Sequence, residues 1–200
     1  MAQKRRRYTQ DDVRELAEGD VIRQSIFDGL SFRGVSLKEC EFEDCSLENA
    51  DLRNVSLSST TFTDCNLANT LVAGASVFGA TFEGCKLLGV DFHEVERTEA
   101  LTFRRCNLDL ADFRGLDLAG VIFDGSSLVE ADLSFTALKK ASLLEADLTR
   151  VALRETTFQQ TDLRGSNLTG WNLRQLDLRG TIMDRQQLEQ LVLELGIQIL

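Results

Sequence analysis

The sequence lacks proline and long apolar runs. Its 200 residues include no proline, one histidine, one tryptophan and one tyrosine. Because proline cannot donate to a backbone ladder, its absence keeps the backbone N–H groups available for stacked, hydrogen-bonded strands. No apolar run approaches the roughly 18 residues that a membrane-spanning helix requires, so we expect no membrane segment. The opening MAQKRRRYTQ has basic residues but no apolar stretch behind them, and it does not match a signal peptide.

Side chains with catalytic or metal-binding chemistry are also scarce. His93 is the only histidine and the five cysteines contain no CxxC pair, so we expect no metal site and no cofactor. No nucleophile has a convincing histidine partner, and no glycine-rich phosphate loop follows a strand. We therefore expect that the protein is not an enzyme.

What is abundant is a period of five residues. Between Phe103 and Met183 every fifth residue is apolar, a small residue usually stands two positions earlier, and the residue between them is often Asp or Asn. The apolar series is Phe103, Leu108, Phe113, Leu118, Phe123, Leu128, Leu133, Leu138, Leu143, Leu148, Leu153, Phe158, Leu163, Leu168, Leu173, Leu178 and Met183. Neither a helical period nor plain alternation produces this pattern. A fixed internal repeat decides the fold.

Each five-residue unit is interpreted as a short extended piece followed by a corner. Residues two apart on an extended chain point to the same side, so the small residue and the Leu or Phe both face inward. The Asp or Asn between them faces water, and the last two residues turn the chain. Many such turns stack into a coil whose backbone pairs with the coils above and below, as in a β-solenoid.

A spacing of twenty residues indicates that the coil has four sides. Phe42, Phe62 and Phe82 recur at this spacing, and so do Cys45, Cys65 and Cys85, whereas a spacing of fifteen mixes residue types. From residue 21 to 183 the repeat predicts about eight coils. Each of the five cysteines (Cys40, Cys45, Cys65, Cys85 and Cys106) occupies a small inward position. We interpret them as core side chains of a protein in the reducing cytoplasm.

The repeat is interrupted once, between Phe92 and Phe103, where the spacing is eleven. One inserted residue predicts a bulge at 93–101, with its inward position near Arg97 or Thr98. A charged segment at a core position should bow outward as a small loop. It is either a tolerated insertion or a recognition element, since loops on rigid scaffolds often carry binding.

Both ends of the chain are expected to cap the coil. Residues 1–20 are interpreted as a disordered basic tail (1–7), or alternatively a DNA-contacting arm, followed by a short helix. Thr9 would begin that helix and Gly19 would close it, with Val13 and Leu16 over the first coil. Residues 184–200 predict a second helix that begins at Asp184 and an apolar tail. Apolar residues at this end exceed what a lid needs, so we expect a homodimer through Leu188, Leu191, Val192, Leu195, Ile197, Ile199 and Leu200.

The charge is acidic, with 22 basic against 32 acidic residues and a net charge of −10. This balance argues against direct nucleic-acid or anionic-membrane binding. Asp51, Asp91, Asp112 and Asp132 fall in one outward column that Leu71 interrupts. A rod with acidic columns could occupy a DNA-binding groove; alternatively, these residues only solvate the surface. The candidate partner-binding residues are Asp51, Asp91, Asp112, Asp117, Asp132, Glu94, Glu96, Arg97, Thr98 and Glu99.

The repeats "ADLSF", "ADLTR" and "TDLRG" resemble the pentapeptide-repeat family. The phenylalanine column, the single interrupted coil and the terminal helix with its apolar tail are similar to the Qnr/MfpA-type group within it. The resemblance implies an all-β solenoid, a right-handed quadrilateral β-helix of about eight coils with short N- and C-terminal helical caps. It also implies a tail-to-tail dimer that mimics DNA, binds DNA gyrase, and protects it from quinolones or natural topoisomerase poisons. A structural or scaffolding pentapeptide-repeat protein with another partner is the alternative.

Overall fold

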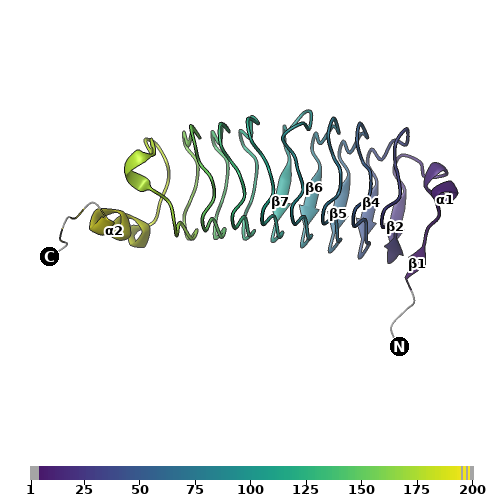
Figure 1. Ribbon diagram of the computed structural model, residues 1–200, viewed down its shortest axis with the longest axis horizontal. Helices are drawn as coiled ribbons and strands as arrows, with labels where there is room; N and C mark the ends of the chain where they lie inside the picture. Colours follow the sequence, from purple (N-terminus) through teal and green to yellow (C-terminus); the bar gives the residue numbers. More distant parts are fainter. Residues whose placement is uncertain (1–4, 195, 197, 199–200) are drawn as a thin grey trace.

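A computed structural model describes residues 5–194, 196 and 198, which form an elongated coil with a short helix near each end (Figure 1). The N-terminal elements are β1 (Arg6–Arg7), α1 (Gln10–Arg14), β2 (Val21–Arg23) and β3 (Ser25–Ile26). The strands along the rod are β4 (Glu41–Glu43), β5 (Thr61–Thr63), β6 (Thr81–Glu83) and β7 (Thr102–Arg104). A 3₁₀ helix, η1 (Leu173–Gln175), and helix α2 (Arg185–Glu194) follow at the other end.

Parallel pairing between successive coils builds one side of the rod. Strands β2, β4, β5, β6 and β7 pair in that order, with Phe42 beside Phe62 and Phe62 beside Phe82. Single bridges continue this ladder through Ile122, Ser142, Asp162 and Ile182. Partners are twenty residues apart, except for twenty-one where Phe82 pairs with Phe103 across the interrupted repeat. The predicted all-β solenoid with four-sided coils is therefore confirmed.

Aromatic rings fill the middle of the rod in two columns. Phe42, Phe62, Phe82, Phe103 and Phe123 stack with ring centroids 5.0–5.3 Å apart and nearly parallel planes. On the opposite side, Phe92 and Phe113 stack at 4.8 Å, and their edges meet the first column. All of these rings are buried. Since the coils repeat at about 4.8 Å, equivalent rings in adjacent coils meet at a favourable stacking distance.

The outward Asp and Asn residues do more than face water. Asp132 accepts a hydrogen bond from the backbone N–H of Ser134 at 2.8 Å, and Asp147 accepts one from Thr149 at 3.0 Å. The same contact to the residue two positions later recurs along the rod, so these side chains stabilise the corners. The corners also need left-handed backbone. At Gly74 φ is +68°, and a Cβ there would lie 2.3 Å from the Asn54 Oδ1 atom.

The N-terminal segment differs from its prediction. Arg6 and Arg7 are not part of a disordered tail; they form β1, which pairs with Ser25 and Ile26 of β3. Residues 1–4 lie outside the described residues, so the rest of that prediction is not tested. Helix α1 begins after Thr9, whose side chain and that of Asp12 form a capping box, and Val13 is buried as expected.

Helix α1 is shorter than the sequence indicates. It ends at Arg14 rather than at Gly19, because the chain then turns and Gly19 donates its N–H to the carbonyl of Lys38 in the next coil. Tyr8 packs on Phe27 with ring centroids 4.3 Å apart, so the pre-helix segment also covers the first coil.

All five cysteines are buried, reduced and inward. Cys45, Cys65, Cys85 and Cys106 lie above one another, and the backbone N–H of Cys65 approaches the Sγ atom of Cys85 at 3.4 Å. Burial raises the pKa of the Cys40 thiol. Their position as small core side chains agrees with the interpretation from the repeat.

Candidate partner-binding surface

The coil brings the predicted acidic column together on one side. Asp51 pairs with Leu71, Leu71 with Asp91, Asp91 with Asp112 and Asp112 with Asp132 as successive rungs. The order of residues, including the interruption at Leu71, agrees with the sequence-based column. The structure thus confirms that these side chains share one side of the rod.

A second column, of basic residues, accompanies the acidic one and was not foreseen. The guanidinium of Arg53 binds both carboxylate oxygens of Asp51 at 2.8 Å, and Arg33 Nε lies 2.9 Å from the same carboxylate. Hydrogen bonds from Arg53 lower the pKa of Asp51 to about 2. A motif of Asp followed two residues later by Arg could have signalled this pairing, since both residues point outward on either side of an inward one.

Asp112 is neutralised in the same way. Arg114 binds both of its carboxylate oxygens, with Nε at 2.9 and 2.8 Å, and its Nε atom lies 3.8 Å from Asp132. Partial burial opposes ionisation of Asp112, but the hydrogen bonds and charge of Arg114 outweigh it and lower the pKa. Three of the four acidic residues in the column, Asp51, Asp112 and Asp132, therefore form ion pairs with arginines, so most of the column is an ion-pair ladder rather than a bare negative stripe.

Asp91 has a different environment. Its carboxylate lies 2.5 Å from Nδ1 of His93 and also accepts the backbone N–H of His93. The hydrogen bond that the His93 ring donates to the Asp91 carboxylate raises the pKa of His93 above its usual value. Glu94 lies 3.5 Å from the other ring nitrogen of His93. This part of the column carries several acidic groups around one imidazole.

Asp117 lies outside the column. It belongs to the adjoining side of the rod, where it pairs with Ala137, and its carboxylate accepts the backbone N–H of Ala119 at 3.0 Å. It is exposed. The structure brings it near the bulge instead, because its carbonyl accepts a hydrogen bond from the hydroxyl of Thr98.

The bulge at 93–101 follows the expected outward path. Val95 and Leu101 stay buried, while Arg97 turns outward with φ +57° and its guanidinium covers the Phe78 ring at 4.5 Å. Glu94, Glu96 and Glu99 are exposed. Glu96 still pairs with Ser76 of the preceding coil, so only part of the segment leaves the ladder. The exposed side chains offer a short acidic ridge beside the column.

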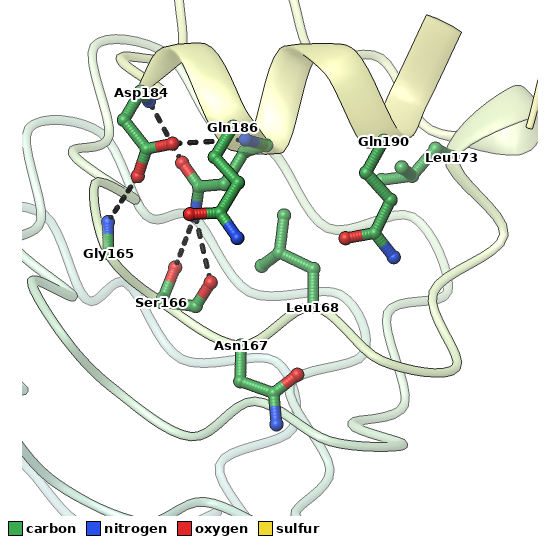
Figure 2. A pocket seen from close by; sticks show the side chains of 9 residues that line it. Gly165, Ser166, Asn167, Leu168, Leu173, Asp184, Gln186 and Gln190 are labelled. Atoms are coloured by element: carbon green, nitrogen blue, oxygen red, sulfur yellow. Dashed lines mark hydrogen bonds between the residues drawn. The ribbon is translucent and has the colours of Figure 1, made fainter. Parts of the chain in front are cut away.

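Helix α2 attaches to the last coil mainly through polar contacts (Figure 2). Asp184 accepts the N–H groups of Gln187 and Gly165 at 3.0 and 2.8 Å, and Gln187 Oε1 accepts the N–H of Asp184 at 2.9 Å. Gln187 is buried and donates to the carbonyls of Leu163 and Ser166. The Asp-x-x-Gln pattern could have identified this anchor from the sequence.

The predicted dimerisation residues fall partly outside the described part of the chain. Leu188 is 47 % exposed and the neighbouring Leu193 is 61 % exposed, while Val192 is partly buried. Leu191 lies in α2, but its side chain is not described, and Leu195, Ile197, Ile199 and Leu200 lie outside the described residues. Leu188 and Leu193 remain available for a partner.

Within the described residues, no helix has the length and apolar character needed to cross a membrane.

The geometry defines a class of protein: a rod of stacked four-sided coils, each side made by five residues. Comparison with protein families places the chain more narrowly. A family model described as a pentapeptide repeat region matches residues 35–113. A second family model, of eight pentapeptide repeats, matches residues 106–143 and 146–185. The chain belongs to the pentapeptide-repeat family.

Solved structures of QnrB1, a plasmid-mediated fluoroquinolone resistance protein, share the fold. A trypsin-treated variant superposes with a TM-score of 0.87 at 21% sequence identity, covering 98% of this chain and 95% of that one. Full-length QnrB1 gives a TM-score of 0.83 at 21% identity and covers 96% and 95% of the two chains. No curated protein sequence matches the chain. The likeness to the fold of QnrB1 therefore covers almost the whole chain.

Proposed function

We propose that this protein is a Qnr-like DNA mimic that binds DNA gyrase, as a dimer, and protects it from quinolones or natural topoisomerase poisons. The observation that carries the proposal is the superposition on QnrB1 over 98% of this chain and 95% of that one. A fold shared from cap to cap preserves the length and cross-section of the rod, the properties by which a protein could occupy a groove made for duplex DNA.

The distribution of charge supports the proposal and refines it. The net charge is −10, and Asp91, Asp117 and the glutamates of the bulge are exposed without a guanidinium ion pair in the described part of the chain. Asp51 and Asp112 are bound by arginines. The proposed gyrase-binding patch is therefore the middle of the rod, around Asp91, Asp117, Glu94, Glu96 and Glu99, rather than the full column.

A scaffolding role with another protein partner is the competing function. The ion pairs of Asp51 and Asp112 favour it, because they reduce the negative potential that DNA mimicry requires. In either function the protein acts by binding and not as an enzyme.

The decisive experiment measures gyrase activity and binding together. Purified protein is added to gyrase supercoiling and quinolone-stabilised cleavage assays, and competition with labelled DNA is measured across a salt series. We expect competition that weakens as salt is added, because exposed charges are screened over about 8–10 Å near physiological ionic strength. We also expect fewer quinolone-stabilised cleavage complexes. Failure to compete with DNA at low salt would leave the scaffolding function as the better account.

Matched variants locate the patch. Asp91→Asn and Asp117→Asn together remove two charges from the proposed patch, and Asp64→Asn and Asp147→Asn remove two charges elsewhere at positions that also have no guanidinium ion pair in the described part of the chain. The first set should weaken competition more than the second. Changing Glu94, Glu96 and Glu99 to Gln tests whether the bulge acts in protection, with binding and cleavage read separately. Equal effects of the two Asp sets would contradict a localised patch.

The dimer is tested independently of gyrase. Leu188→Asp and Leu193→Asp place charges at two exposed apolar positions of α2, and Gln186→Asp is the control at an exposed polar position of the same helix. Sedimentation should give a dimer for the wild type and the control, and a monomer for the leucine variants. A wild type that is monomeric at all accessible concentrations excludes the dimer.

A further inference from the structure

We propose that Asp91, His93 and Asp112 form a binding site for a divalent transition-metal ion of the Zn²⁺ class, with Glu94 as a further oxygen ligand. This site was not predicted from the sequence, because a single histidine without CxxC motifs does not suggest a metal site. In the folded coil, however, Asp112 pairs with Asp91 on the adjacent rung, which brings a second carboxylate beside His93.

The geometry of the cluster suits a small cation. One ligand atom from each of Asp91, His93 and Asp112 lies within 4.8 Å of the other two. Ligands about 2.1 Å from Zn²⁺ in a tetrahedral site are about 3.4 Å apart. The Asp91 oxygen and His93 Nδ1, which are 2.5 Å apart, would separate by about 0.9 Å, and the wider gaps of the cluster would close by up to about 1.4 Å. Asp91 and His93 are 58 % and 38 % exposed at their side chains, which leaves them free to make this movement. One imidazole with carboxylates is a ligand set that borderline divalent ions accept.

The charge pattern of the column gives an independent reason for a cation at this place. Asp51 contacts two guanidinium groups, from Arg33 eighteen residues before it and Arg53 two residues after it. At the equivalent positions around Asp91 stand Ala73 and His93. Asp91 forms its only ion pair within the described residues with His93. The ladder of guanidinium groups thus skips the rung of Asp91 and resumes at Asp112 with Arg114, so the imidazole of His93 is the partner of Asp91 where an arginine stands at the rungs of Asp51 and Asp112.

Arg114 is the natural competitor for the metal ion, since it holds both oxygens of Asp112. Its Nε atom also lies 3.8 Å from Asp132, so Arg114 keeps an acidic partner when Asp112 turns toward the ion. The proposed site therefore has an internal antagonist whose removal should tighten metal binding.

A bound ion would act beside the interrupted coil. It would join the rung of Asp91 to that of Asp112, and these two rungs lie on either side of the segment 93–101. It would also place positive charge in the middle of the acidic column. The inference does not depend on the proposed function, because it concerns this chain and a metal ion alone.

The single histidine provides a direct test. Full-length protein labelled with ¹⁵N is titrated with ZnCl₂ in mildly alkaline buffer, and the imidazole ¹⁵N resonances of His93 are followed. We expect them to shift and saturate at one ion per chain. Asp91→Asn and Asp112→Asn should each weaken the affinity roughly tenfold or more, and Arg114→Gln should strengthen it. Asp51→Asn, at an equivalent rung bound by two arginines, is the control and should leave the titration unchanged.

Each alternative outcome decides against the site. A resonance that does not move at excess Zn²⁺ overturns the proposal and leaves His93 as a hydrogen-bond partner of Asp91. A shift that persists equally in Asp91→Asn and Asp112→Asn means that the imidazole binds the ion alone, which also overturns it. Backbone ¹⁵N spectra of every variant establish that the coil is intact.

Discussion

The coils before residue 150 and the last coil obey the same repeat but differ in closure. In the earlier coils the four sides pair, except that the described residues show no bridge between the bulge and Asp117; for example, Leu133, Phe135 and Leu138 donate to the carbonyls of Ala152, Arg154 and Thr157. One coil later, two sides still pair, through Asn167 and Ile182. On the other two sides the described residues show no bridge from Ala152 or Thr157 onward, and η1 replaces the extended segment. Figure 1 shows the last coil standing apart from its neighbour.

Trp171 accounts for the incomplete pairing of the last coil. Trp171 stands in the small inward column after Ala111, Ala131 and Val151. The indole is buried, donates its Nε1–H to the carbonyl of Leu148 at 2.9 Å and packs on Phe158. A protein interior has no spare room for such an increase in volume, so the coil opens around it. An open cavity of about 640 Å³ lies beside Trp171 as a result.

This comparison teaches that the apolar position alone does not close a coil. Leu153, Leu168, Leu178 and Met183 keep the period of five, yet they are only partly buried, whereas Leu133 and Leu138 are fully buried. The small residue two positions earlier sets the width that the ladder can span.

The largest expected effect comes from truncating an inward side chain in a closed coil, compared with the same change in the open last coil. Phe62→Ala removes a ring stacked between Phe42 and Phe82 and should cost about 3–5 kcal/mol. Leu178→Ala, in the open coil, should cost under about 2 kcal/mol because its side chain is already partly exposed. Denaturant unfolding of both variants measures the contrast. Similar losses would mean that the two regions pack equally well.

Hydrogen exchange should map the open edge residue by residue. The N–H groups of Leu133, Phe135 and Leu138 are bonded to the next coil. The equivalent groups of Leu153, Glu155 and Phe158 donate to no backbone carbonyl within the described residues. We expect them to exchange at least about 100-fold faster, a difference of about 2.7 kcal/mol in opening free energy. Equal protection at the two sets would show that the last coil closes in solution.

A smaller effect is expected at the anchor of α2. Gln187→Ala removes the buried amide that bonds to Leu163 and Ser166 and should weaken helix docking by about 1–3 kcal/mol. Gln186→Ala, at an exposed position one residue earlier, is the matched control. Exchange of the α2 amides reports the docking. If both variants behave alike, the helix is held by other contacts.

The smallest expected effect is on the acid dependence of stability in the closed coils. The pKa of Asp51 is lowered from 3.8 to about 2, so its ion pairs contribute fully above about pH 4 and this contribution is lost as the pH falls toward 2. Asp51→Asn should remove at most about 1 kcal/mol of this acid dependence, because Arg33 and Arg53 are substantially exposed. Unfolding free energies measured between those pH values test it. An unchanged acid limb in the variant would assign the ion pairs no role in stability.

The sequence by itself determined the coil. The period of five separates inward from outward positions, and the columns at twenty residues define four sides, because identical side chains stack when coils do. The buried phenylalanines, the inward cysteines and the course of the bulge follow from these periods. The sequence also contains the spacing that pairs Asp51 with Arg53 and the pattern by which Asp184 caps α2, so both contacts could be predicted from it.

Tertiary structure decided the contacts between neighbouring coils and at the two ends. The charge environment of Asp91 depends on where the His93 ring and the Arg114 guanidinium lie. These positions depend on side-chain rotamers, which the five-residue repeat does not predict. Pairing of Arg6 and Arg7 with β3 was missed because a two-residue basic strand has no apolar pattern. The opening at Trp171 was not predictable from the apolar series, since closure of a coil depends on the volume available across its interior.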